Sequence, residues 1–281
     1  MPATVQFVPT AFSLIAVFCW GTSDFLGGYA SKRSDSFLVT LLSHVGGFVL
    51  MITLVLASHA VLPSRTSQLW AVAAGALGGI GLALFYRALA SGRMGLAAPV
   101  AAVLGAAIPT TFGIVVEGFP GAMPVAGFVL AGLGIWLISR PDSRTGSEGL
   151  GLAFLAGLGF AGFFLCINQT GVASAVWSAA ISRFASLVLV GFIVLVRGGV
   201  PRVRRMDAIL GIFAGFLDST GTLVFIRADQ TGRLDAAVVL TSLYPAVTVL
   251  LARFLLKEHF TRWKAVGIAA ALLAVPLIAL R

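Results

Sequence analysis

The chain has 281 residues, of which 59% are hydrophobic and only 10% are charged, and its formal net charge is +9. Ordinary globular domains carry about a quarter charged residues, so this composition excludes a soluble globular fold and indicates a protein embedded in a membrane. The apolar runs are about 20 residues long, the length of a membrane-spanning helix and twice that of a barrel strand. We therefore predict an all-α protein that crosses a bacterial-type inner or cell membrane many times.

The apolar runs predict ten membrane-spanning helices. The first run lacks a basic leader and a small-residue cleavage site, so we interpret it as a spanning helix and not as a signal peptide. Short charged or polar linkers separate the runs, and the segment 141–148 is the expected divider between two halves. The ten predicted helices are 11–30, 37–57, 69–90, 94–116, 122–139, 149–168, 176–196, 207–227, 235–256 and 263–280.

Prolines interrupt two of these predicted helices. Pro99 and Pro109 lie inside the fourth, and Pro245 lies inside the ninth. An interior proline removes one backbone hydrogen bond and kinks the helix. In transporters such breaks often lie beside the substrate site, whereas elsewhere the kink is absorbed by packing, and the sequence leaves both readings open.

The second half of the chain repeats the first at an offset of 140 positions. The matched residues are mainly glycines, arginines and small apolar residues, which predicts a duplicated packing scheme. Matched pairs include Gly75/Gly215, Arg87/Arg227, Gly92/Gly232 and Arg93/Arg233. We expect one five-helix repeat in residues 1–140 and a second in residues 141–281. Because five is odd, the second repeat enters the membrane from the opposite side, so the repeats are inverted about an axis in the membrane plane.

Lys and Arg residues gather in the linkers that follow the first, third, fifth, seventh and ninth predicted helices. The positive-inside rule makes that side cytoplasmic and predicts that both termini face outward. These short clusters form no basic, aromatic surface, so we expect no nucleic-acid partner. Cys19 and Cys166 lie inside apolar runs, so neither a disulfide framework nor a metal site is expected.

Two carboxyl groups lie inside apolar helices, where charged groups are costly and mark functional sites. Asp24 lies in the first helix, with Trp20 and Gly28 one turn on either side, and Asp218 lies in the middle of the eighth. Either carboxyl group is a candidate for binding and releasing protons during transport. The alternative is a structural carboxylate bonded to a neighbouring hydroxyl group or arginine.

Arg183 and His44 fall at matching places in the two halves, at an offset of 139. A buried arginine can bind a substrate carboxylate with two hydrogen bonds or form an ion pair that holds helices together. His44 can be a simple hydrogen-bonded core residue. Arginines at helix ends are expected to reach the membrane interface, and Glu117 and Glu258 are expected to cap their helices or pair with loop arginines.

Three further side chains have polar tips on apolar helices and are expected to line a cavity. For Tyr86, which is close to a helix end, anchoring at the membrane interface is the alternative. The residues predicted to bind substrate are Trp20, Asp24, Tyr86, Asn168, Arg183, Asp218 and Tyr244.

Enzyme signatures are missing from the sequence. We find no nucleophile elbow, Walker loop, His-Glu-x-x-His motif or Cys-x-x-Cys motif. We therefore expect no enzymatic activity, no cofactor and no catalytic metal.

Three segments of the chain form a recognisable pattern: Trp20 to Asp24, Gly95 to Pro99 with Pro109 and Glu117, and Ser242 to Pro245 through Glu258 to Gly267. Their order and spacing resemble those of the EamA-type transporters of the drug/metabolite transporter superfamily. The resemblance covers almost the whole chain and implies ten helices in two inverted repeats around a central cavity. It also implies movement of small metabolites by alternating access, with amino acids, sugars, nucleotide-related compounds and drugs as known classes. In many relatives less acidic residues follow the tryptophan of this opening, so Asp24 suggests a subgroup with its own ligand or coupling.

The function we expect is secondary active transport, with export of a small metabolite such as an amino acid, an analogue or a drug-like amphipath. The site is expected between predicted helices 1, 3, 4, 6, 8 and 9, with a small-molecule substrate, membrane lipid and candidate coupling protons as partners. A lipid-carrier flippase or a membrane enzyme component is the alternative, and it requires a groove open to lipid. A passive channel is a third possibility, but a channel rarely needs two buried aspartates.

Overall fold

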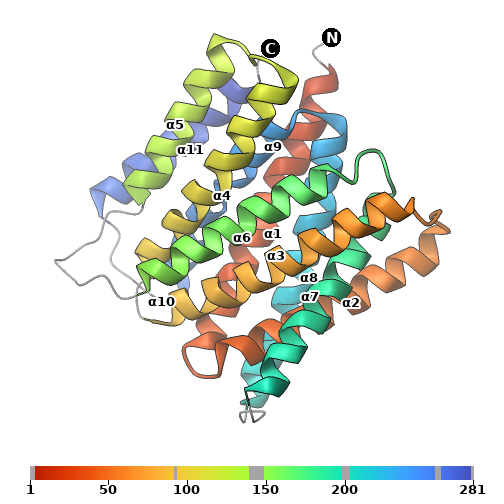
Figure 1. The fold of residues 1–281 in the computed structure, drawn as a ribbon. Coiled ribbons are helices and arrows are strands. Elements are labelled where there is room, and N and C mark those ends of the chain that lie inside the picture. Colours follow the sequence, from red (N-terminus) through yellow and green to blue (C-terminus); the bar gives the residue numbers. More distant parts are fainter. Residues whose placement is uncertain (1–3, 92–93, 139–148, 198–202, 257–260, 280–281) are drawn as a thin grey trace.

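The structure is a computed structural model that describes residues 4–91, 94–138, 149–197, 203–256 and 261–279. These residues form helices and connecting turns, without a strand in the described ranges (Figure 1). The helices are α1 Thr4–Ser31, α2 Ser36–Ser58, α3 Arg65–Ala90, α4 Met94–Glu117, α5 Ala122–Ile138, α6 Leu150–Asn168, α7 Ala175–Val196, α8 Arg205–Thr231, α9 Leu234–Thr241, α10 Tyr244–Leu256 and α11 Arg262–Ala279.

Nine of the ten predicted spanning helices each correspond to one helix of the structure, and the ninth corresponds to α9 and α10 together, so the all-α membrane fold with ten spans is confirmed. Among the described residues, eight spans are long and apolar enough to cross a membrane, and α5 is a shorter apolar helix. The start of α1 and the end of α11 lie at the same end of the bundle, as an even number of crossings requires (Figure 1). The chain is therefore an integral, multi-pass membrane protein.

The ninth predicted span is divided into α9 and α10 by a turn at Ser242 and Leu243. Pro245 follows this turn and has no backbone N–H to donate to the carbonyl group of Thr241, so the hydrogen-bond ladder stops there. Pro99 and Pro109 do not divide α4 in this way: its backbone stays helical past both positions.

Polar side chains fix several helix starts. The Asp35 carboxylate accepts hydrogen bonds from the backbone N–H groups of Phe37 and Leu38 at the start of α2. Ser174 does the same for Trp177 at the start of α7. Such caps satisfy N–H groups that have no partner inside the helix, and they begin α2 and α7 one residue before the predicted starts.

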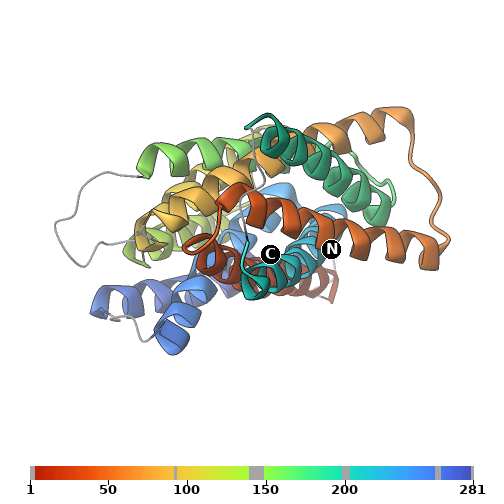
Figure 2. The same ribbon diagram turned by 90° about the horizontal axis from the view of Figure 1, so that it is seen from below.

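The helices pack in pairs that a two-fold exchange of the halves would produce. The exchange matches α1 with α6, α2 with α7, α3 with α8, and α4 with the α9–α10 span. Accordingly, the α1–α8 contact matches the α6–α3 contact, and the α2–α8 contact matches the α7–α3 contact. The contact of the α9–α10 span with α1 matches that of α4 with α6. The α2–α7 and α5–α11 pairs, which such an exchange maps onto themselves, lie on opposite sides of the bundle (Figures 1 and 2). This pairing supports the predicted repeats, although the predicted boundary at 140/141 lies outside the described residues.

Matched glycines make matched contacts. A Cβ atom on Gly75 would collide with the backbone carbonyl of Ser182, and one on Gly215 would collide with that of Ser43. Gly75 and Gly215 are 140 residues apart, and Ser43 and Ser182 are 139 apart. Glycine therefore lets α3 approach α7, and α8 approach α2, at the same place in each half.

Candidate functional site

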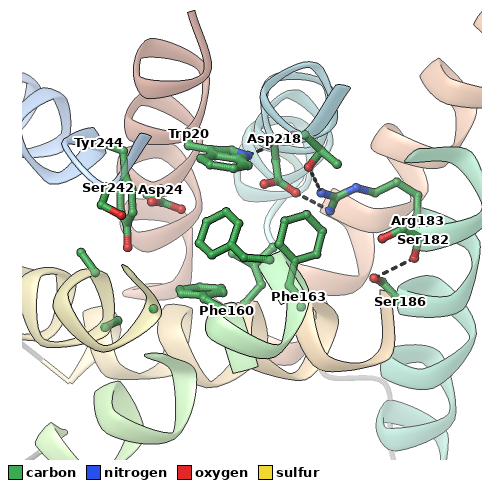
Figure 3. Close-up of a pocket in the computed structure, with 17 residues that line it drawn as sticks. Trp20, Asp24, Phe160, Phe163, Ser182, Arg183, Ser186, Asp218, Ser242 and Tyr244 are labelled. Carbon is green, nitrogen blue, oxygen red and sulfur yellow. Dashed lines mark hydrogen bonds and ion pairs between the residues drawn. The ribbon is translucent and has the colours of Figure 1, made fainter. Parts of the chain in front are cut away.

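A pocket lies among α1, α3, α4, α6, α7, α8 and the turn between α9 and α10 (Figure 3). It contains about 640 Å³ of empty space, part of which is open to solvent. Five of the seven predicted site residues line it: Trp20, Asp24, Arg183, Asp218 and Tyr244. The predicted set of helices omitted α7, which contributes Ser182, Arg183 and Ser186.

One wall of the pocket holds an ion pair between α7 and α8. The Arg183 Nη1 atom contacts the Asp218 carboxylate, and Nη2 donates a hydrogen bond to Thr222 Oγ1 at 2.5 Å. Both charged side chains are at least nine-tenths buried. Since a buried ion is costly without a partner, we interpret Arg183 as a group engaged by the protein itself.

His44 extends this pair toward α2. Its Nδ1 atom lies 3.4 Å from Arg183 Nη1. Because a guanidinium group only donates hydrogen bonds, Nδ1 must be the acceptor, which assigns a neutral imidazole with its proton on Nε2. The side chain is fully buried. His44, Arg183 and Asp218 thus form one polar chain across three helices.

Asp24 is the pocket's unpaired charge. Its residue is only 6% exposed, yet its carboxylate has no hydrogen-bond or ion-pair partner in the described part of the chain. The carboxylate lines the pocket, on the side where Ser242 and Tyr244 also face it (Figure 3). The charged groups of the pocket are therefore two carboxylates and one guanidinium group, which leaves one negative charge in excess when both aspartates are ionised.

The break between α9 and α10 supplies polar groups beside α1. The Tyr244 hydroxyl is buried and has no hydrogen-bond partner among the described residues. The Thr248 hydroxyl donates to the Gly21 carbonyl at 3.0 Å and so ties α10 to α1. An unpartnered buried hydroxyl at a pocket wall is a group available to a ligand.

Trp20 joins the polar wall to an aromatic one. Its indole N–H donates to the backbone carbonyl of Asp218 at 3.1 Å, which links α1 to α8. Its ring lies 5.9 Å from that of Phe164, centroid to centroid. Phe160, Phe163 and Phe164 of α6 are spaced three and four residues apart, so they share one helix face and form the apolar wall.

The other two predicted site residues lie elsewhere. Tyr86 is fully buried against α1, where its hydroxyl is 3.4 Å from Ser23 Oγ. Asn168 ends α6 and donates from Nδ2 to the carboxylate of Asp229 at 3.1 and 3.2 Å. Neither residue lines the pocket.

The sequence analysis also missed the phenylalanines of α6. The repeat carries a signal for them, because a shift of 140 positions places Phe160 on Trp20 and Phe164 on Asp24. These residues line the same pocket from the two halves.

Charged groups join α4 to α9 at one end of the bundle. Arg233 donates to the backbone carbonyls of Glu117 and Gly118 at 2.9 and 2.6 Å, and it forms ion pairs with Glu117 and Asp235. The hydrogen bond to Asp235 raises the pKa of Arg233, which keeps its charge. Glu117 thus pairs with a linker arginine, as expected, whereas Glu258 lies outside the described residues. At the opposite end of α8, Arg33 pairs with the buried carboxylate of Asp207.

Comparisons with known proteins agree with this architecture. The model of the EamA-like transporter family matches residues 147–280. A solved crystal structure of a protein, whose description states no function, superposes with a TM-score of 0.78 at 16% identity, covering 97% of this chain and 98% of the other. At that identity the likeness establishes the fold alone. No curated protein sequence matches the chain significantly.

Proposed function

We propose, from the premise that residues 147–280 belong to the EamA-like transporter family, that the chain is a secondary transporter that exports a small amphipathic metabolite. The observation that carries this proposal is the pocket between the halves, with the unpaired carboxylate of Asp24 facing a wall of aromatic rings. Substrate sites at the interface of inverted repeats, beside a broken helix, are typical of alternating-access transporters.

The contacts at the ends of the bundle suggest how access alternates. Arg233 holds the end of α4 to the start of α9 at one end of the bundle. The turn at Ser242 and Leu243 lets α9 and α10 move separately, because no continuous helical ladder joins them. We propose that opening of the α4–α9 contact exposes the pocket on one side of the membrane while the other side closes.

Asp24 is also the group best placed to couple transport to protons. A carboxylate without a protein partner can hold either a substrate or a proton, so binding of one releases the other. The Asp218 carboxylate is less suited to this role because it is held by Arg183. Export would then follow when a proton from outside replaces the departing substrate on Asp24.

A lipid-carrier flippase or membrane enzyme is the alternative function. A flippase would need charged groups at head-group depth that are free to bind a lipid phosphate. Arg33 and Arg233, which lie near the ends of α8, are each engaged by carboxylates of the protein. These two arginines are therefore not free to bind a lipid phosphate.

Ligand screening followed by transport tests this function. The purified protein is heated with a panel of amines, amino acids, organic anions and sugars, since a ligand that binds the folded state raises the unfolding temperature. Each stabilising compound is then radiolabelled and its exchange measured in proteoliposomes. We expect exchange that Trp20→Ala abolishes. Stabilising compounds that are not exchanged, or exchange that Trp20→Ala leaves unchanged, would contradict the proposal.

A further inference from the structure

Positions that the repeat matches carry different chemistry in the pocket. At positions related by 140 residues, Trp20 corresponds to Phe160, Asp24 to Phe164, and Thr222 to Leu82. The polar member of each pair lies on α1 or α8, and the apolar member lies on α3 or α6. A ligand that satisfies both walls must therefore carry its polar group at one end and its apolar body at the other.

Arg183 is poorly suited to bind a ligand carboxylate. Its Nη1 atom contacts Asp218 and lies 3.4 Å from His44 Nδ1, and its Nη2 atom donates to Thr222. A ligand carboxylate would have to displace Asp218 and leave that buried carboxylate without its counter-charge. Breaking a buried ion pair in this way is strongly unfavourable, and the incoming anion would have to offset that loss.

Asp24 presents the opposite situation. When ionised it lacks a counter-charge, because the described protein supplies no cation within ion-pair distance. The Tyr244 hydroxyl, which also faces the pocket without a partner, can accept a second hydrogen bond from the same ligand. Aromatic faces beside a carboxylate further favour a positive charge.

We infer that the pocket recognises an amphipathic monocation: a protonated amine that binds Asp24, joined to an apolar or aromatic body that packs on the phenylalanines of α6, without a carboxylate. This inference rests on the proposed transport function and names its substrate class. An amine of this kind neutralises the excess negative charge of the pocket without disturbing the Arg183–Asp218 pair. A zwitterionic amino acid gains the same contact at Asp24 but brings a carboxylate that has no free partner.

Three probes that share a phenylethyl group separate these charges. Phenethylamine is the cation, phenylalanine adds a carboxylate to it, and 3-phenylpropionate keeps the carboxylate without the amine. Binding of each probe to the detergent-purified protein is measured by calorimetry near pH 7. We expect phenethylamine to bind at least about tenfold more tightly than phenylalanine, the factor that about 1.4 kcal/mol gives, and 3-phenylpropionate to give no heat of binding.

Two substitutions test where the amine binds. Asp24→Asn removes the charge with little change of shape, and we expect it to weaken phenethylamine binding at least about tenfold. Asp229→Asn is the matched control, because Asp229 is a carboxylate of α8 bonded to Asn168 and outside the pocket. If Asp24→Asn fails to fold, Tyr244→Phe is used in its place. It removes only the unpartnered hydroxyl group, and we expect it to weaken phenethylamine binding a few-fold.

The outcomes separate this inference from the transport function. Phenethylamine that does not bind, phenylalanine or 3-phenylpropionate that binds as tightly, or amine binding that Asp24→Asn leaves unchanged would overturn the inference. The transport function would survive that result if another compound of the panel were exchanged in proteoliposomes in a Trp20-dependent way. Conversely, Asp24-dependent binding of the amine supports the inference even if the proteoliposomes exchange none of it.

Discussion

His44 and Arg183 occupy matching positions in the two halves of the chain and meet across the α2–α7 contact, with Nδ1 and Nη1 3.4 Å apart. A residue and its repeat partner can touch only close to the axis that relates the halves. The pair therefore places the polar chain of the pocket next to that axis.

This contact predicts how stability changes when His44 is replaced by an arginine that matches Arg183. In His44→Arg, a second guanidinium group faces that of Arg183 in a buried site, and like charges repel there. We expect the unfolding temperature to fall by roughly 5–10 °C, whereas His44→Gln, which keeps an acceptor, lowers it by less than about 3 °C. Thermal unfolding in detergent measures the unfolding temperatures of both variants. An equal fall for the two would show that a hydrogen-bond acceptor at position 44 is unimportant.

The Arg183–Asp218 pair predicts non-additive losses of stability. Asp218→Leu leaves a buried guanidinium group without its counter-charge, and Arg183→Met leaves a buried carboxylate, each at a cost of about 3–5 kcal/mol. The double variant should recover most of this loss, because two apolar side chains replace two ions. Unfolding measurements on the four proteins of the cycle test this, and additive losses would contradict a direct pair.

The matched glycines predict matched sensitivity. Gly75→Ala and Gly215→Ala each force a methyl group against a backbone carbonyl, so we expect each to destabilise the protein by about 1–3 kcal/mol. Gly132→Ala is the control, since a Cβ atom there meets no described atom within 4 Å. Comparable unfolding temperatures for the three variants would argue against the close contacts of α3 with α7 and of α8 with α2.

The Arg233 contacts predict which end of the pocket they close. Cysteine is introduced as Ser242→Cys, with Cys19→Ser and Cys166→Ser in the background, and its reaction with a membrane-impermeant maleimide is timed from each side. We expect Arg233→Gln to speed labelling from the side where α9 begins by about three- to fivefold, the population shift that about 1 kcal/mol gives. Arg33→Gln, which breaks the pair at the other end of α8, serves as control. No change with Arg233→Gln would mean that these contacts do not control access.

The sequence predicted the fold well because lipid leaves few choices. Each apolar run of spanning length had to become a helix, so the ten spans follow from composition and length. The repeat also indicated which helices approach closely, since glycines at matched positions mark those contacts. The division of the ninth span at Ser242 was less predictable, because Pro109 in α4 has a similar setting and leaves its helix unbroken.

The lining of the pocket was predicted only in part. Asp24, Asp218 and Arg183 could be found because charges inside apolar helices are rare. Asn168 was included for its polar tip, but it lies at the end of α6, where the carboxylate of Asp229 binds it. Which face a polar group occupies, and whether a neighbour already engages it, depends on packing between helices distant in the sequence.

Exchange of labelled phenethylamine in proteoliposomes tests the central claim most directly, because it requires the pocket between the halves to be the transport site. Wild type, Asp24→Asn and the control Asp229→Asn are compared at equal amounts of folded, reconstituted protein. The account predicts that Asp229→Asn exchanges the amine like wild type and that Asp24→Asn loses at least about nine-tenths of the rate, the tenfold factor of about 1.4 kcal/mol. Exchange by Asp24→Asn at the wild-type rate would contradict it.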